Sequence, residues 1–282
     1  MAARQSQQGT PRDTAELEAA FSAFAQNYER QSGGITRKVA EKALQMLSPI
    51  TSSSVVHDNG CGPGIVTTTI LRDAAAKGTT PPKIEATDVA KGMIELLQSE
   101  ILKNGWNTVN AQIRDSSDLG CFEDGTFTHS ITNFAIFTLP DPAKGAREIR
   151  RTLKDGGVAL VTVWSLMDNL AIIHGAQKAI RPDLPVFNPA SPDWFHDWKV
   201  RSVMEEAGFS KVEVKEVKNY WEIESEQRFS ELFDDPFWNI VKKDWTDEDK
   251  AKWHQECLNQ FTDEQRKDKR LRANAWVCIA TK

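Results

Sequence analysis

The sequence has little cysteine and no long hydrophobic run, and each absence excludes a class of protein. Its four cysteines lie far apart and form no metal-type pair. This excludes a disulfide framework and a cysteine metal site, and it predicts reduced thiols in a cytoplasmic protein. No apolar run approaches the roughly 20 residues of a membrane helix, and residues 1–13 lack a secretory signal pattern. We therefore expect neither a metal nor a membrane partner.

The sequence also lacks an excess of basic charge. Lys and Arg total 35 against 40 Asp and Glu, which gives a net charge of -5. Nucleic-acid binding depends on positive charge, so we expect no nucleic-acid partner. Histidine is scarce too, and each histidine is expected to lie in the packing or on the surface, so no catalytic base is predicted. The five histidines are His57, His129, His174, His196 and His254.

Short apolar runs alternate with amphipathic segments through the first two thirds of the chain. Repeated βα units of this kind predict a mostly parallel sheet with helices on both faces. We expect an α/β, Rossmann-like fold with a seven-stranded sheet. The expected strands are 55–58, 83–88, 109–114, 128–137, 158–164, 212–223 and 273–281. The expected helices begin near Asp13 (with Leu17, Phe21, Phe24 and Tyr28 on one face) and include 35–47, 65–76, 90–103, 142–153 and 198–207.

The composition predicts a single domain made of several distinct regions. Seven of the nine tryptophans lie between Trp164 and Trp253, which predicts an aromatic-rich cap. Four prolines between 165 and 198 predict short helices and loops there. The expected parts are a disordered tail (1–12) and a single domain (13–282), made of an N-terminal helical cap (13–50), a cofactor-binding core (51–164) and substrate-side cap and helices (165–210 and 225–268).

The most informative segment is a glycine-rich turn between the first core strand and its helix. Asp58 ends an apolar run, and Gly60, Gly62 and Gly64 follow at alternate positions. Such a turn places backbone N–H groups at a helix N-terminus, where a carboxylate-bearing ligand can bind. The spacing differs from the Gly-x-Gly-x-x-Gly of dinucleotide folds, so it favours S-adenosylmethionine over nicotinamide cofactors. Cys61 has no histidine partner in the sequence and is expected to pack near the cofactor rather than act as a nucleophile.

Further candidates follow the next three strands, at the sheet edge where ligands bind in such folds. Asp88 ends the second strand, where a carboxylate can accept both ribose hydroxyls. Met93 can pack a soft side chain against a purine. Asp115-Ser116 can meet an exocyclic amine and a ring nitrogen, and Asn133-Phe134 faces the centre of the cleft. An acidic residue after a strand is also a common helix cap. The prediction of a ligand site therefore rests on the order of these residues behind the glycine turn and not on any one of them.

With these motifs in register, the sequence resembles the class I S-adenosylmethionine-dependent methyltransferases. The resemblance is carried by segments 58–64, 88–93, 115–119 and 133–157. It implies that the glycines hold the methionine moiety, Asp88 the ribose, and Asp115 and Ser116 the adenine, and that Tyr28 reaches the cofactor carboxylate. The residues expected to bind the cofactor are Tyr28, Asp58, Gly60, Cys61, Gly62, Gly64, Asp88, Val89, Met93, Asp115, Ser116, Asn133 and Phe134.

The cap after the fifth strand resembles that of fungal secondary-metabolite methyltransferases, among them those that S-methylate dithiols such as reduced gliotoxin. Asn133-Phe-Ala-Ile136 lacks the Pro-Pro-Tyr of adenine and glutamine methylation, so a small apolar acceptor is expected, bound by Phe134 and Trp164. A thiol needs less base assistance than a phenol, and the absence of an evident base favours a thiol. An O- or N-methyltransferase, and a protein that uses the cofactor without methyl transfer, stay open. The sequence is compatible with a monomer.

Overall fold

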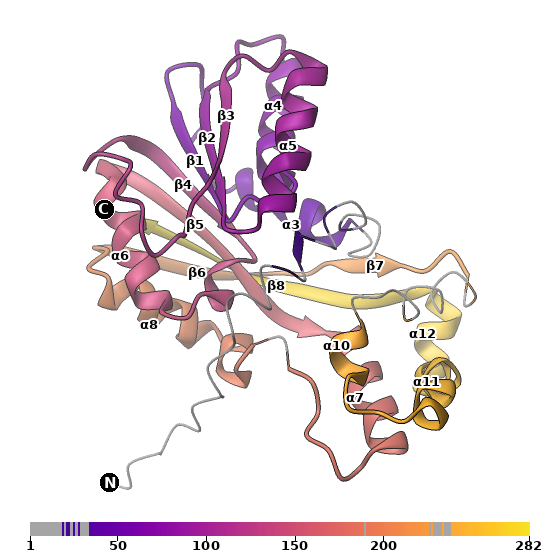
Figure 1. The fold of residues 1–282 in the computed structure, drawn as a ribbon. Helices are drawn as coiled ribbons and strands as arrows, with labels where there is room; N and C mark the ends of the chain where they lie inside the picture. The colour runs from indigo at the N-terminus through magenta and orange to yellow at the C-terminus, as the bar shows by residue number, and fades with distance from the viewer. Residues whose placement is uncertain are drawn as a thin grey trace, which may run out of the picture.

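The computed structural model describes residues 19, 21, 22, 25, 28, 34–188, 190–225, 227, 233 and 238–282 (Figure 1). The expected tail 1–12 lies outside these residues, as do Leu17 and Phe24 of the expected first helix. The strands are β1 (Val55–Asn59), β2 (Lys83–Asp88), β3 (Val109–Ile113), β4 (Phe127–Asn133), β5 (Leu153–Met167), β6 (Lys211–Val217), β7 (Tyr220–Glu222) and β8 (Arg270–Thr281). The α-helices are α3 (Ile35–Leu44), α4 (Ile65–Ala76), α5 (Lys91–Asn104), α6 (Pro142–Thr152), α7 (Asp168–Ile180), α8 (Asp197–Glu206), α10 (Asn239–Lys242), α11 (Asp247–Asn259) and α12 (Asp263–Asp268), with 3-10 turns η2 (Ile136–Thr138) and η3 (Pro192–Phe195).

The strands form one sheet in the order β3-β2-β1-β4-β5-β8-β6. The pairs from β3 to β5 are parallel, whereas β8 runs antiparallel between β5 and β6. The expected Rossmann-like, mostly parallel sheet is therefore confirmed. Among the described residues, no helix is long and apolar enough to cross a bilayer.

Helices cover both faces because side chains alternate along the buried strands. On β5, Leu160 packs with α3 and α4, while its neighbours Ala159 and Val161 pack with α6 and α8 on the other face. Figure 1 shows these two helical layers on either side of the sheet. The central strands are thus buried on both sides, and their carboxyl ends lie together at one edge.

An aromatic-rich cluster forms beyond this sheet, where β5 and β8 extend toward α7, α10, α11 and α12 (Figure 1). Trp253 is 1% exposed and donates its indole N–H to the Phe233 carbonyl oxygen at 3.0 Å. Trp245 packs edge-on against the Trp253 ring with centroids 5.5 Å apart. Much of the tryptophan excess therefore packs together as a second core.

Two expected segments in the second half of the chain differ from the structure. The expected strand 212–223 is divided into β6 and β7 at Lys218-Asn219, although β7 keeps the pairing register of β6 with β8. Asn219 instead donates its side-chain amide to the Ile35 carbonyl oxygen of α3 at 3.3 Å. The prediction of short helices and loops throughout 165–198 was wrong at its start, because β5 runs to Met167 and α7 follows at once. The breaking prolines begin only at Pro182.

The expected strand 128–137 ends early. β4 stops at Asn133, and Phe134 takes a φ of 56°, which turns the chain away from the sheet into η2. A bulky residue in the left-handed region is unusual. This turn forms one wall of the candidate site.

Candidate cofactor cleft

The residues proposed for the site meet in a cavity of about 180 Å³ at the carboxyl ends of β1, β2 and β4. This is the edge at which ligands bind in open α/β sheets. The 16 lining residues are Phe21, Tyr28, Gly60, Gly62, Asp88, Val89, Ala90, Met93, Asp115, Ser116, Asn133, Phe134, Ala135, Thr138, Leu139 and Pro140.

A smaller cavity of about 20 Å³ shares several of these walls and adds the remaining part of the glycine turn. Asp58 and Cys61 line this second cavity, together with Tyr28 and Asn133. Gly64 lines neither cavity. It precedes α4 with a φ of 87°, and an added Cβ would lie 2.5 Å from Leu97 Cδ1. Its role is close packing of the turn.

Two further glycines of the turn, Gly60 and Gly62, have positive φ angles, which residues with side chains rarely adopt. Gly60 has a φ of 66°, and a Cβ there would lie 2.5 Å from the Cβ of Ala135. Gly62 has a φ of 52° and no atom within 4 Å of an added Cβ. The turn therefore contacts the β4 turn at Gly60 and leaves open space at Gly62.

Asp88 joins the β2 end to the glycine turn. Its Oδ2 accepts the backbone N–H of Gly62 at 2.8 Å, and its Oδ1 accepts that of Ala90 at 2.9 Å. Burial raises the pKa of Asp88, against the lowering effect of these two hydrogen bonds. Each carboxylate oxygen retains a second lone pair, so the group can still accept ligand hydroxyls.

Asp58 lies beneath the turn and is 1% exposed. Its Oδ2 accepts the backbone N–H of Thr67 at 2.9 Å and the Thr67 hydroxyl at 2.6 Å. Its Oδ1 has no hydrogen-bond partner among the described residues. Burial raises the pKa of Asp58 to about 6. A buried carboxylate oxygen of this kind requires a donor, and Asp58 lines the smaller cavity.

The N-terminal segment contributes two aromatic residues to the cleft. Tyr28 and Phe21 both line the larger cavity, and Tyr28 lines the smaller one as well. Burial raises the pKa of Tyr28 to about 12, and the nearby Asp88 charge adds to the rise. The Tyr28 hydroxyl therefore stays protonated at neutral pH and is suited to donate a hydrogen bond.

The other end of the cleft is formed by the residues after β2 and β3. Met93 is 2% exposed and packs on Ala25 and Ala90. Asp115 is exposed and its Oδ1 accepts the Ser117 N–H at 2.7 Å, while Ser116 is buried. Both line the cavity, as the predicted adenine contacts would have to.

Phe134 and Trp164 were both expected to contact the acceptor, but only Phe134 lines the cleft. Phe134 lines the cleft, whereas the Trp164 ring stacks on it with centroids 3.9 Å apart and does not line the cavity. Trp164 thus supports Phe134 from the side of the aromatic cluster.

No histidine is among the described residues that line the cleft. His57 is fully buried on β1, where it stacks on Phe127 at 4.7 Å and its Nε2 is paired with the Thr87 hydroxyl at 2.9 Å. Burial lowers the pKa of His57 to about 3. Burial also raises the pKa of the Cys61 thiol, which is not a ready nucleophile. In the described part of the chain, no group of three or more His, Cys, Asp or Glu residues could hold a metal ion.

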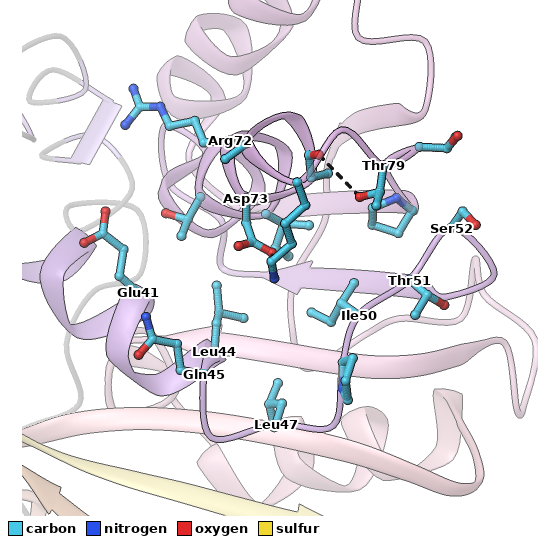
Figure 2. Close-up of a pocket in the computed structure, with 18 residues that line it drawn as sticks. Glu41, Leu44, Gln45, Leu47, Ile50, Thr51, Ser52, Arg72, Asp73 and Thr79 are labelled. Carbon is cyan, nitrogen blue, oxygen red and sulfur yellow. Dashed lines mark hydrogen bonds and ion pairs between the residues drawn. The ribbon is translucent and has the colours of Figure 1, made fainter.

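A larger hollow of about 790 Å³ lies elsewhere (Figure 2). Figure 2 shows it between Leu44 and Leu47 on one side and Arg72 and Asp73 of α4 on the other. Thr51 and Ser52 place it before β1, at the amino ends of the strands. It contains none of the motif residues, so size does not identify the site here.

Sequence reasoning missed Ala90, Ala135, Thr138, Leu139 and Pro140 as lining residues. Four of them follow Phe134: Ala135 lies within the expected strand 128–137, and Thr138, Leu139 and Pro140 lie just after its expected end. Their only sequence signal is position after an expected strand end. Phe21 was expected on the first helix but not in the site.

Residues 57–161 match the protein family described as "Methyltransferase domain". The match runs from β1 into β5 and includes the glycine turn, Asp88 and the β4 turn. These residues form a methyltransferase domain. The match supports S-adenosylmethionine as the methyl donor, so the cofactor expected from the sequence is confirmed.

The similarity of the methyltransferase domain to known proteins extends beyond this span. Methyltransferase ktnA of Aspergillus niger is 26% identical, over 72% of this chain and 74% of its own length. The acetylaranotin bis-thiomethyltransferase of Aspergillus terreus is 26% identical, with 74% of each chain covered. The fold is similar to that of Haemonchus contortus phosphoethanolamine N-methyltransferase 2 in complex with S-adenosyl-L-methionine (TM-score 0.52, 16% identity, 87% of this chain and 52% of the other).

Proposed function

We propose that the chain S-methylates the thiols of a small apolar acceptor, most directly a reduced epidithiodiketopiperazine such as dithiol gliotoxin. Bound S-adenosylmethionine would supply an activated methyl group and leave as S-adenosylhomocysteine. The choice of a thiol rests on one observation: the described residues that line the larger cavity include no histidine, lysine or cysteine. The similarity to a bis-thiomethyltransferase supports the same choice.

The residues present fit the cofactor. The unpaired Asp58 Oδ1 at the smaller cavity suits the ammonium group of the methionine moiety. Tyr28, protonated beside the same cavity, suits its carboxylate. Asp88 would then accept the ribose hydroxyls, and Asp115 with Ser116 would meet the adenine. Each group in this order lines one of the two cavities.

Alignment is the main requirement of an in-line methyl transfer, because the donor is already activated. A thiol with a pKa near 8.5 is a few per cent ionised at neutral pH, whereas a phenol near 10 is far less so. Tyr28 remains protonated and cannot accept the proton of an acceptor. The two carboxylates of the larger cavity, Asp88 and Asp115, are assigned to the cofactor. A thiol acceptor is therefore the chemistry that this site can serve without a base.

We place the acceptor between the β4 turn and the aromatic-rich part of the chain, with residues 165–210 and 225–268 as its cap. Phe134 connects the two, since it lines the cleft and stacks on Trp164. Residues 51–164 serve as the cofactor-binding core. This arrangement would place an apolar acceptor against aromatic surface.

The test is methyl transfer to matched acceptors. The full chain is incubated with S-adenosylmethionine and a reduced epidithiodiketopiperazine, a phenol or an amine, and products are read by mass spectrometry. We expect one or two methyl groups on the dithiol and little on the others. Methylation of only the phenol or the amine would favour the O- or N-methyltransferase alternative. Binding of the cofactor without transfer to any acceptor would favour a non-methylating protein.

A further inference from the structure

We propose that Thr162 on β5 is a positioning residue for methyl transfer, because its hydroxyl holds the turn Asn133–Ala135 in the shape that the cleft requires. The inference rests on the proposed function. Thr162 lies directly beside Asn133 in the parallel β4–β5 pair and is fully buried. It does not line either cavity, so its effect would pass through its neighbours.

The Thr162 hydroxyl makes two hydrogen bonds, one as acceptor and one as donor. It accepts the backbone N–H of Phe134 at 3.0 Å and donates to Asn133 Oδ1 at 2.8 Å. The Thr162 carbonyl oxygen also accepts the Phe134 N–H, at 3.2 Å. Only a hydroxyl provides both an acceptor and a strong donor in this space. Valine would keep the shape of the side chain and lose both bonds.

The turn needs such support because Phe134 has a φ of 56°. A bulky side chain disfavours this conformation, and it persists only where surrounding contacts enforce it. The Phe134 ring is fixed by Trp164 on one side. The hydroxyl of Thr162 fixes the backbone on the other.

The Thr162 bond also fixes the orientation of the Asn133 amide. Oδ1 is bound to Thr162, and Nδ2 lies 3.4 Å from the Thr36 carbonyl oxygen. The reverse orientation would place two oxygens together at Thr36. Asn133 lines both cavities, and this orientation leaves its amide N–H groups, rather than its oxygen, on the side away from Thr162. Ala135, at the end of the same turn, lies against Gly60. Loss of the hydroxyl would therefore move three walls of the cleft at once.

The experiment compares Thr162→Val, Thr162→Ser and the control Thr152→Val in the full chain. Thr152 is a buried threonine of α6 whose hydroxyl donates to the Glu148 carbonyl oxygen, away from the cleft. We expect kcat for methyl transfer to fall about tenfold or more in Thr162→Val, since Asn133 Oδ1 loses its partner and the Phe134 N–H keeps only the longer bond to the Thr162 carbonyl oxygen. Thr162→Ser should restore most of it, and Thr152→Val should match the wild type. Rates are taken per folded protein.

A purely structural Thr162 would lower thermal stability in Thr162→Val and leave kcat unchanged, and this would overturn the proposal. Equal losses in the serine and valine variants would overturn it too, because size rather than the hydroxyl would then matter. Hydrogen exchange at the Phe134 amide gives a readout independent of activity. If the wild type methylates nothing, the proposed function fails, while faster Phe134 exchange in Thr162→Val would support the positioning role and unchanged exchange would overturn it.

Discussion

At the scale of single residues, Asp88 connects the glycine turn to the proposed ribose site. Its carboxylate accepts the N–H groups of Gly62 and Ala90 and lines the cleft. Asp88→Asn would place an amide N–H against one of these donors and remove the charge. We expect the affinity for S-adenosylmethionine to fall by about 1–3 kcal/mol, or roughly fivefold to 150-fold, as measured by calorimetry.

The matched control is Glu85→Gln, on the same strand but away from the cleft. Glu85 accepts a hydrogen bond from Asn110 at 2.7 Å and lines neither cavity. Its affinity for the cofactor should equal that of the wild type. Equal affinities for the Asp88→Asn variant and the wild type would show that the ribose lies elsewhere.

Asp58 predicts how cofactor affinity depends on pH. Burial raises the pKa of Asp58 to about 6, and the proposed ammonium contact needs its ionised form. Affinity should be nearly constant above pH 7 and fall about tenfold for each pH unit below 6. Titrations between pH 5 and 8 measure this. Asp58→Asn should bind more weakly at pH 8 and lose most of the slope. An unchanged slope in this variant would contradict the ammonium assignment.

At the scale of elements, one ion pair joins the start of α7 to β8. Asp168 is 5% exposed and accepts the backbone N–H of Arg272 at 2.8 Å and its guanidinium at 3.0 Å. Asp168→Ala leaves these donors without their acceptor, and we expect the free energy of unfolding to fall by about 1–3 kcal/mol. Denaturant titrations provide the measurement.

Asp183→Ala is the control, because Asp183 is paired with Arg181 at 2.7 Å but is largely exposed. An exposed pair contributes at most about 1 kcal/mol. Similar losses in the two variants would show that the Asp168 pair does not fix α7 more firmly than an ordinary surface pair.

At the scale of the whole molecule, two adjacent buried groups, His57 and Asp58, have opposite effects on the stability of the fold in acid. Burial lowers the pKa of His57 to about 3, so the unfolded chain takes up this proton first and stability is lost as pH falls from 6.5 toward 3. Burial raises the pKa of Asp58 to about 6, so the folded chain takes up that proton first and stability is gained as pH falls from 6 to 4.

The two effects should nearly cancel between pH 6 and 4. In Asp58→Asn without cofactor, only the His57 effect remains, and we expect an additional loss of about 1.4 kcal/mol per pH unit relative to the wild type. Urea unfolding at pH 6, 5 and 4 measures the difference. Parallel stability curves for the two proteins would contradict the pKa assignments.

The whole fold could be largely predicted from the sequence, because its signals are local. Apolar runs gave the core strands, and the glycine turn gave the site's position. The turn at Phe134 could not be predicted, since a phenylalanine at positive φ depends on Thr162 and Trp164, which lie far along the chain. For the same reason Ala135 and Thr138 were missed in the cleft. The β6–β7 break depends on the bond from Asn219 to α3 and has no local signal either.

Calorimetric titration of the full chain with S-adenosylmethionine at neutral pH tests the central claim most directly. A cleft built from the glycine turn, Asp58, Asp88 and Asn133 should bind one cofactor per chain, and Asp88→Asn should weaken this binding while Glu85→Gln does not. The absence of binding at millimolar cofactor in the folded wild type would contradict the assignment of this cleft.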